Sequence, residues 1–285
     1  MTIFGIGTVV VDDVVELPRF PEADTKVELT RHWQQVGGPV PVALSTAAFY
    51  GSKTSFMGRW GNDETGRLIQ KTLQQRSIDL SCSRSADAWT SGRAQVWVDS
   101  STGSRTIAFS RGDLIMPDEC DIDEPTLKQC QILHLDGWAF AAAIKAASIV
   151  NSNGGTVVLD AGSVKPGMHE LLPLVNILIA SALFRKSLFG HKDVGSKELL
   201  TLGPENIITT DGENGAAWHC HHDDITETAV RVNPVDTNGA GDIFSGAILH
   251  AITNKWSRSD SLKFANRVAG FSCAQHGNYS LPTIN

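Results

Sequence analysis

Continuous apolar segments that alternate with helical stretches constrain the fold of this chain more than any other feature. Segments 131–138, 156–162 and 176–182 are apolar along their length rather than at every second position. Such runs are typical of strands covered on both faces, as in a parallel sheet. A helical stretch at 139–150 separates the first two. The pattern predicts an α/β fold with a doubly wound, mainly parallel sheet flanked by helices.

The same alternation continues through the rest of the 285 residues. We expect strands at 3–11 and 54–60, and helices at 42–50, 63–75, 242–253 and 259–276. There is no internal repeat and no linker-like segment. A single domain over residues 1–285 is therefore expected, which is within reach of one large α/β domain.

Two segments show the period of two that is typical of strands with one exposed face. Residues 92–110 alternate around a turn at Thr102-Gly103, which predicts a hairpin, and residues 25–36 alternate in the same way. Together they predict a small separate sheet. Such a sheet would lie over the ligand crevice or pair with a second subunit, so a homodimer is expected.

Composition excludes several classes of function. The net charge of -7 argues against a general nucleic-acid binder, which needs a basic face. No apolar run approaches the length that crosses a bilayer, and the first residues lack the basic region of a signal peptide. The five scattered cysteines predict free thiols and a cytoplasmic location. The histidine-rich segment 218–224 is interpreted as a solvated hairpin tip rather than a metal site.

The segment 235–249, VDTNGAGDIFSGAIL, is the strongest candidate for a functional site. It leaves a strand and enters a helix, and its glycines allow a ligand to approach the backbone. Amide groups of residues 239–242 at the helix N-terminus favour an anion such as a phosphate. Asp242 beside them could accept a proton from an attacking alcohol. An ordinary capped helix start explains the same spacing, so both interpretations remain open on spacing alone.

The letters DTNGAGDIFSGA resemble the C-terminal signature of the ribokinase-like (PfkB) carbohydrate kinases. The resemblance implies that Asp242 is the catalytic base and that the amides of Gly239, Ala240 and Gly241 form an anion hole for the transferred phosphoryl group. It also implies an ATP-dependent phosphotransferase that uses Mg²⁺ and, in some members, a monovalent cation. Thr237 and Asn238, in the same signature, are expected beside the nucleotide.

Further segments extend the resemblance over nearly the whole chain. Residues 58–66, GRWGNDETG, are similar to a family segment where a strand meets a helix. The remaining matches imply a sugar site at Asp12, Gly37 and Gly38, and nucleotide contacts at Thr210, Gly212 and Gly215. An ordinary turn is the alternative for the last two glycines. The period-two segments match the family's β lid, at about 13–36 and 92–110, which closes over the sugar and often forms the dimer contact.

Two departures from the family pattern bear on the site. Val42 replaces the asparagine that usually contacts the substrate. The N-x-x-E motif that organises magnesium is replaced, with Ser181 and Phe184 at its positions, and neither can act as a carboxylate ligand. Asp160 is a weak candidate for the metal. A strand-end aspartate that caps the next helix is an equally good interpretation of it.

The overall sequence is most similar to the branch of ketohexokinase-like and sulfofructose-kinase-like proteins. Lys26 and Arg93 on the lid segments are candidates for holding an anionic group of the substrate, with solvent-facing charges as the alternative. Trp138 stands where sulfonate-binding kinases would place an arginine, so we expect a neutral or singly charged ketose or a related sugar alcohol. Two alternatives stay open: a non-catalytic sugar or nucleotide sensor, and a nucleoside kinase that uses lid aromatic residues (Trp33, Trp97, Phe109) to hold a base.

Overall fold

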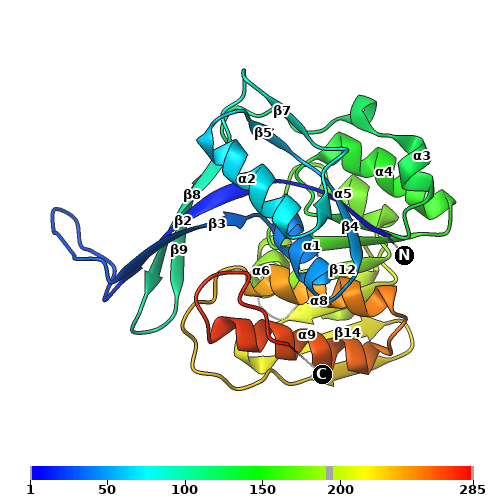
Figure 1. Ribbon diagram of the computed structural model, residues 1–285. Helices are drawn as coiled ribbons and strands as arrows, with labels where there is room; N and C mark the ends of the chain where they lie inside the picture. The colour runs from blue at the N-terminus through cyan, green and yellow to red at the C-terminus, as the bar shows by residue number, and fades with distance from the viewer. Residues whose placement is uncertain (1, 191–194, 284–285) are drawn as a thin grey trace.

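A computed structural model describes residues 2–190 and 195–283 of the chain. Among these residues, nine strands form one large sheet in the order β15-β14-β13-β12-β11-β10-β1-β4-β6 (Figure 1). Their bounds are β1 (Thr2–Ile6), β4 (Lys53–Met57), β6 (Ile78–Asp79), β10 (Ile132–Leu135), β11 (Thr156–Ala161), β12 (Ile177–Ser181), β13 (Asn206–Thr210), β14 (Ala216–Cys220) and β15 (Asp224–Glu227).

The large sheet is mainly parallel, as the continuous apolar runs predict. Every neighbouring pair from β6 to β13 is parallel, and the two pairs that follow, β13–β14 and β14–β15, are antiparallel. A parallel arrangement brings the carboxyl ends of the central strands to one edge of the sheet. In open α/β sheets that edge is where ligands bind.

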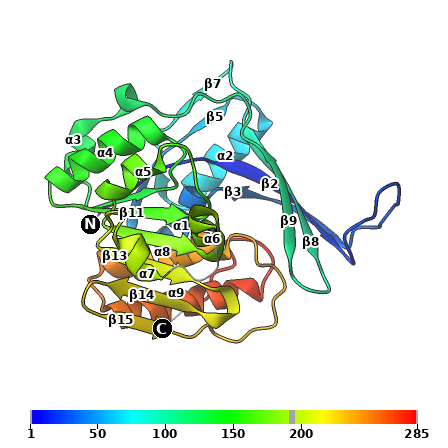
Figure 2. The ribbon, with the colours of Figure 1, turned by 180° about the vertical axis from the view of Figure 1, so that it is seen from behind.

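Helices cover both faces of the large sheet (Figures 1 and 2). One core forms against α1 (Pro39–Phe49), α2 (Glu64–Gln75), α8 (Ala240–Thr253) and α9 (Arg258–Cys273). The other forms against α3 (Glu124–Lys128), α4 (Phe140–Ser152), α5 (Met168–Leu171), α6 (Ala182–Phe189) and α7 (Ser196–Leu200). Alternate residues of the strands enter opposite cores: Ile132 the first and Leu133 the second. The doubly wound fold is confirmed.

A separate four-stranded sheet, here called the small sheet, extends from one end of the body (Figure 1). Its order is β3-β2-β8-β9, with bounds β2 (Val10–Leu17), β3 (Arg31–Gly37), β8 (Gly92–Asp99) and β9 (Arg105–Ser110). The hairpin predicted for 92–110 is present as the antiparallel pair β8–β9. A third sheet pairs only β5 (Arg59–Gly61) with β7 (Arg84–Ala86).

Three strand predictions differ from the structure. The expected strand 3–11 divides into β1 and β2, so that the chain leaves the large sheet after Ile6 and enters the small sheet at Val10. The expected strand 54–60 divides in the same way, into β4 and β5. Residues 25–30 form no strand: the chain that would pair with them carries Pro18 and Pro21, which lack an N–H donor for a ladder.

None of the helices in the described part of the chain combines the length and the apolar character that a membrane crossing requires.

Candidate active site

The N-terminus of α8 lies where two pockets meet and presents unpaired backbone donors. Gly239 is the residue before the helix and has φ 77°, a conformation that favours glycine. The Ala240 N–H donates a long hydrogen bond of 3.3 Å to the Thr237 carbonyl. Within the described residues, the N–H groups of Gly239, Gly241 and Asp242 have no acceptor. Three donors at the positive end of a helix dipole can hold an anion.

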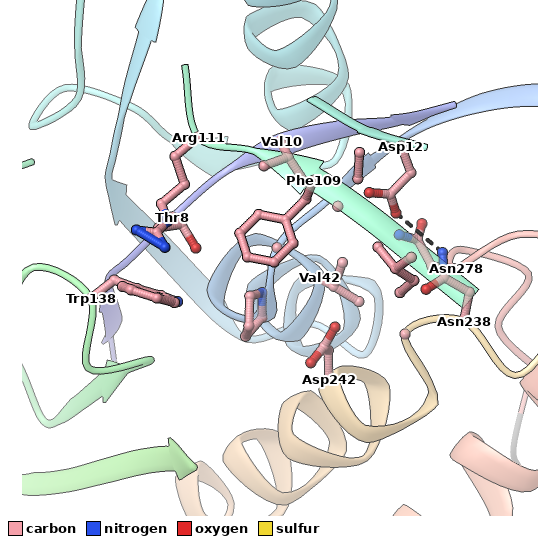
Figure 3. Close-up of a pocket in the computed structure, with 16 residues that line it drawn as sticks. Thr8, Val10, Asp12, Val42, Phe109, Arg111, Trp138, Asn238, Asp242 and Asn278 are labelled. Atoms are coloured by element: carbon pink, nitrogen blue, oxygen red, sulfur yellow. Dashed lines mark hydrogen bonds between the residues drawn. The ribbon is translucent and has the colours of Figure 1, made fainter. Parts of the chain in front are cut away.

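The side chain of Asp242 points into the space above the helix (Figure 3). The residue is half-buried and lines the first pocket. Loss of water contact, together with the nearby carboxylate of Asp160, raises the pKa of Asp242 well above its ordinary value, and the cation of Arg105 opposes that rise. A raised pKa makes this carboxylate a stronger proton acceptor, which suits a general base.

The first pocket, here called the acceptor pocket, encloses about 210 Å³ between the small sheet, α1 and α8. Strand register builds one of its walls. Asp12 on β2 pairs with Gln35 on one side and Ala94 on the other, and Ala94 pairs with Phe109. These four side chains lie in one row on the same face of the small sheet, because opposed residues share a face. Val42 of α1 completes the apolar part of the pocket.

Asp12 lies at one end of the acceptor pocket beside Asn238 and Asn278 (Figure 3). Its Oδ2 accepts hydrogen bonds from Asn238 Nδ2 at 3.2 Å and from Gln35 Nε2 at 3.4 Å. Burial raises the pKa of Asp12 to about 6, although both hydrogen bonds oppose the rise. The buried Oδ1 of Asn278 has no partner among the described residues. This end of the pocket can therefore accept hydroxyl hydrogen bonds.

The two glycines predicted to bind the substrate are required by close approach. A Cβ on Gly37 would lie 2.5 Å from both carboxylate oxygens of Asp12. Gly38 has φ 107°, and a Cβ there would overlap the Thr8 carbonyl. Both residues line the acceptor pocket. The di-glycine turn thus allows α1 to start directly beneath the carboxylate of Asp12.

The second pocket, here called the nucleotide pocket, is larger, at about 690 Å³. Thr210, Gly212, Gly215 and Thr237 all line it, so the structure brings together four of the five residues predicted to contact the nucleotide. Gly215 has φ 99°, and a Cβ on it would lie 2.6 Å from the Ala229 nitrogen. The fifth residue, Asn238, lies in the acceptor pocket instead, where it donates to Asp12.

The structure does not bring Lys26 or Arg93 into the acceptor pocket. Lys26 is exposed on the loop between β2 and β3, which projects away from the body (Figure 1). Arg93 is exposed and pairs with Val11, on the face of the small sheet opposite Asp12. Of the three aromatic residues considered for a nucleoside base, only Phe109 lines the pocket. Trp33 instead donates to Gln35, and Trp97 packs edge-on against Phe20.

Sequence reasoning missed several residues of the acceptor pocket, above all Arg111 and Asn278. Arg111 follows directly after β9, so continuing the predicted hairpin by one residue would have found it. Asn278 lies in the segment 278–280, NYS, where the sequence gives no sign of a pocket contact. Trp138 was singled out only as a replacement, and it also lines the pocket.

Asp160, the weak candidate for a Mg²⁺ ligand, belongs to no cluster of three or more His, Cys, Asp or Glu side chains that could hold a metal among the described residues. It lies at the end of β11, accepts a hydrogen bond from Ser245 Oγ at 2.7 Å, and raises the pKa of Asp242. Burial raises the pKa of Asp160 itself to about 6. A cation between two such carboxylates would relieve their repulsion, and carboxylate oxygen is a ligand that Mg²⁺ prefers. Ser181 and Phe184 offer no such ligand, because Ser181 Oγ caps α6 and Phe184 is buried.

Comparison with known proteins places this geometry in context. The model of the family described as "pfkB family carbohydrate kinase" matches residues 4–284. A deoxyribokinase of Salmonella typhi is 25% identical over 293 residues, covering 98% of this chain and 95% of the relative. A Bacillus subtilis ribokinase is 24% identical over 282 residues, covering 98% and 96%.

Solved structures of similar fold agree with the sequence comparison. Arabidopsis thaliana ribokinase, solved with ribose and ATP, superposes with a TM-score of 0.84 at 25% identity, covering 98% of this chain and 95% of that one. A putative ribokinase from Agrobacterium tumefaciens gives a TM-score of 0.88 at 23% identity, covering 99% and 94%.

Proposed function

Because the chain belongs to the PfkB family of carbohydrate kinases and is therefore an ATP-dependent kinase, we propose that it phosphorylates a hydroxyl group of a small sugar, with Asp242 as the base. The observation that carries the proposal is the position of the Asp242 carboxylate. It points into the acceptor pocket from a helix N-terminus where the N–H groups of Gly239, Gly241 and Asp242 have no acceptor among the described residues.

The reaction follows from this arrangement. A sugar hydroxyl lies against Asp242 while other hydroxyl groups bind Asp12 and Asn238 at the pocket end. The hydroxyl oxygen forms a bond to the γ-phosphorus of ATP, the bond from that phosphorus to the bridging oxygen of ADP breaks, and the hydroxyl proton passes to Asp242. The N–H groups of Gly239, Ala240 and Gly241 stabilise the charge on the transferred group.

ATP occupies the nucleotide pocket in this proposal. Thr210, Gly212 and Gly215 line the part of the pocket formed by β13 and the turn after it. Thr237 lines the part closest to α8, which directs the terminal phosphate towards the amide donors. Asp160 and the nucleotide phosphates would hold Mg²⁺, which neutralises phosphate charge when bound.

A requirement for a monovalent cation stays a prediction. Exchanging potassium for tetramethylammonium in the assay tests it.

The size of the acceptor pocket favours a sugar over a nucleoside. About 210 Å³ is below the range of roughly 300–1,000 Å³ that is typical of pockets for drug-sized ligands. Trp33 and Trp97 do not line the pocket, so among the described residues Phe109 is the only one of these three lid aromatic residues that could contact a base. Among sugars, we propose a ketose or a related carbohydrate as the acceptor.

An ADP-release screen tests the proposed function. The panel contains ketoses, aldoses, sugar acids, sugar phosphates and adenosine, each at several concentrations with saturating ATP and Mg²⁺. We expect turnover with one class of small sugar and none with adenosine. Binding without ADP release across the whole panel would instead identify a non-catalytic sensor.

We also propose a homodimer through the small sheet and a cytoplasmic location. All six residues of β9 are exposed and β9 is an edge strand, which offers unpaired backbone groups to a second copy. Light scattering at several concentrations tests the dimer. The five cysteines are all free, which is typical of a reducing compartment.

A further inference from the structure

Two cations lie around the indole ring of Trp138, which lines the end of the acceptor pocket opposite Asp12. The guanidinium carbon of Arg111 lies 3.7 Å from the centroid of Trp138, and the Nζ atom of Lys165 lies 5.1 Å from it. Arg111 and Trp138 line the pocket, and Figure 3 places them across the cavity from Asp12 and Asn238. Asp242 points into the space between the two ends.

Neither cation is neutralised by an ion pair. Arg111 forms no hydrogen bond or salt bridge with any described residue, so all five of its N–H donors are available. Arg59, which lines a small neighbouring pocket with Arg111, is committed to Asp121 and to the Ile115 carbonyl. Lys165 is 8% exposed, and within the described residues the only hydrogen bond of its ammonium group is to the Ser163 carbonyl at 3.2 Å. A buried ammonium group without an ion pair is costly unless a ligand offsets that cost.

Asp136, the carboxylate whose charge acts most strongly on Lys165, is already hydrogen-bonded to other groups. Asp136 Oδ2 accepts from the Thr8 N–H at 2.8 Å and from Thr8 Oγ1 at 3.0 Å. Asp136 Oδ1 accepts from the Trp138 N–H at 2.9 Å. Asp136 therefore fixes the loop that carries Trp138. Neither Asp136 nor Asp160 forms a salt bridge with Lys165, although the charges of both act on Lys165 from a distance.

We propose that Arg111, which lines the pocket, forms an anion subsite that binds a carboxylate or phosphate substituent of the acceptor sugar, and that the charge of Lys165 beside Trp138 adds to it. The inference rests on the proposed function and narrows its substrate class to a sugar acid or a sugar phosphate. Hydroxyl groups at one end of such a molecule bind Asp12 and Asn238, and its anionic group binds at the other end. The hydroxyl that is phosphorylated lies between them, against Asp242.

This subsite is separate from the place of the transferred phosphate. That phosphate belongs at the amide groups of Gly239–Gly241, beside which Arg105 of the small sheet donates to Thr237 and acts on Asp242. Arg111 lies on the Trp138 side of the pocket instead. Hydrogen bonds to charged groups contribute roughly 1.5–3 kcal/mol each, so an anionic substituent should tighten binding roughly 10- to 100-fold.

Calorimetric titration of matched acceptor pairs without nucleotide tests the subsite. The pairs are ribose with ribose 5-phosphate, fructose with fructose 1-phosphate, ribitol with ribonate, and glucitol with gluconate, all at equal ionic strength. The first two pairs test a phosphate group and the last two test a carboxylate group, so the titrations distinguish a sugar phosphate from a sugar acid. Each pair is titrated into wild type and the Arg111→Met, Lys165→Met and Arg111→Lys variants. Arg19→Met, on the exposed loop after β2, is the matched control.

We expect wild type and the control to bind the anionic member of at least one pair at least roughly 10-fold more tightly than the neutral member. Arg111→Met loses that preference, Lys165→Met reduces it, and Arg111→Lys keeps part of it. Equal binding in every pair, or a preference that survives in Arg111→Met, overturns the inference. Thermal melts identify any variant that fails to fold. If Lys165→Met does not fold, the Arg111→Met variant still decides the test, because Arg111 is exposed and its replacement should not disturb the core.

Turnover assays separate this inference from the proposed function. Phosphorylation of neutral sugars without a preference for the anionic members would support the proposed function and contradict the anion subsite. An anion preference without ADP release leaves the subsite and removes the kinase. If Arg111→Met lowers kcat equally for both members of a pair and weakens ATP binding, the two cations serve the transferred phosphate instead, and the inference is wrong.

Discussion

The Thr237 hydroxyl accepts a hydrogen bond of 3.1 Å from Arg105 Nη1, which joins the small sheet to the segment that leads into α8. The same hydroxyl donates to the Gly103 carbonyl at 3.2 Å. Thr237 lines the nucleotide pocket, and the charge of Arg105 acts on Asp242. The tip of the β8–β9 hairpin therefore reaches the boundary between the two pockets.

The Arg105 cation should set the pH dependence of turnover. Its charge lowers the pKa of Asp242, so Arg105→Met raises that pKa further, and less of the base is ionised at a given pH. We expect the acidic limb of the kcat profile to move to higher pH, so that the loss of rate is larger at pH 6 than at pH 8.5. Superposable profiles for Arg105→Met and Arg19→Met would contradict this electrostatic role.

Asp12 should couple stability to pH. Its pKa is about 6 in the folded protein against 3.8 for the ordinary group, so the folded state binds the proton more tightly. The stability that protonation provides is fully present below pH 3.8 and is lost as the pH rises through about 6. The Asp12→Asn variant cannot titrate at this position, so it does not show this loss of folding free energy, which is at most about 3 kcal/mol.

Melting curves of wild type and Asp12→Asn between pH 4 and pH 8 measure the effect. The Tm of the variant minus that of wild type should become more positive as the pH rises through 6, whatever its value at pH 4. A difference that stays constant over this range would show that Asp12 has no raised pKa. Protonation of Asp12 should also affect activity. At pH values below about 6, kcat/KM for the acceptor should decrease, because a protonated Asp12 accepts fewer hydroxyl hydrogen bonds.

Gly215 should be essential to the nucleotide pocket and dispensable for the acceptor pocket. A Cβ at this position would overlap the Glu227 carbonyl and lie 2.6 Å from the Ala229 nitrogen, at φ 99°. Gly215→Ala should therefore displace the turn and raise the KM for ATP, with the acceptor dissociation constant unchanged. Gly154→Ala, at φ 75° with nothing within 4 Å, is the control for backbone strain alone. Equal KM values for ATP in the two variants would refute the steric argument.

Periodicity predicted the architecture well because both faces of the large sheet are buried. The runs at 131–138 and 156–162 became β10 and β11, and the alternating segment 92–110 became a hairpin. Boundaries were less predictable: 3–11 has the apolar character of one strand, yet it serves two sheets. Alternation alone predicted that the third strand begins at residue 25. Pro18 and Pro21, in the segment after β2 that would pair with residues 25–30, lack the N–H donors that the ladder needs.

The site could be predicted in part. Asp12, the di-glycine turn and the segment around Asp242 were found because their residue types and spacing are distinctive. Lys26 and Arg93 have suitable charge and approximate location, but strand register places Arg93 on the face of the small sheet opposite Asp12. Arg111, one residue beyond β9, faces the pocket beside Trp138. One sequence without coordinates does not show which of several lid cations faces inwards.

The rate of a single turnover in Asp242→Asn tests the central claim most directly. With a limiting amount of labelled ATP, excess enzyme and an acceptor identified in the screen, we expect phosphoryl transfer at least about 100-fold slower than in wild type, with the ATP dissociation constant changed little. A near-normal rate in a folded Asp242→Asn protein would contradict the assignment of Asp242 as the base.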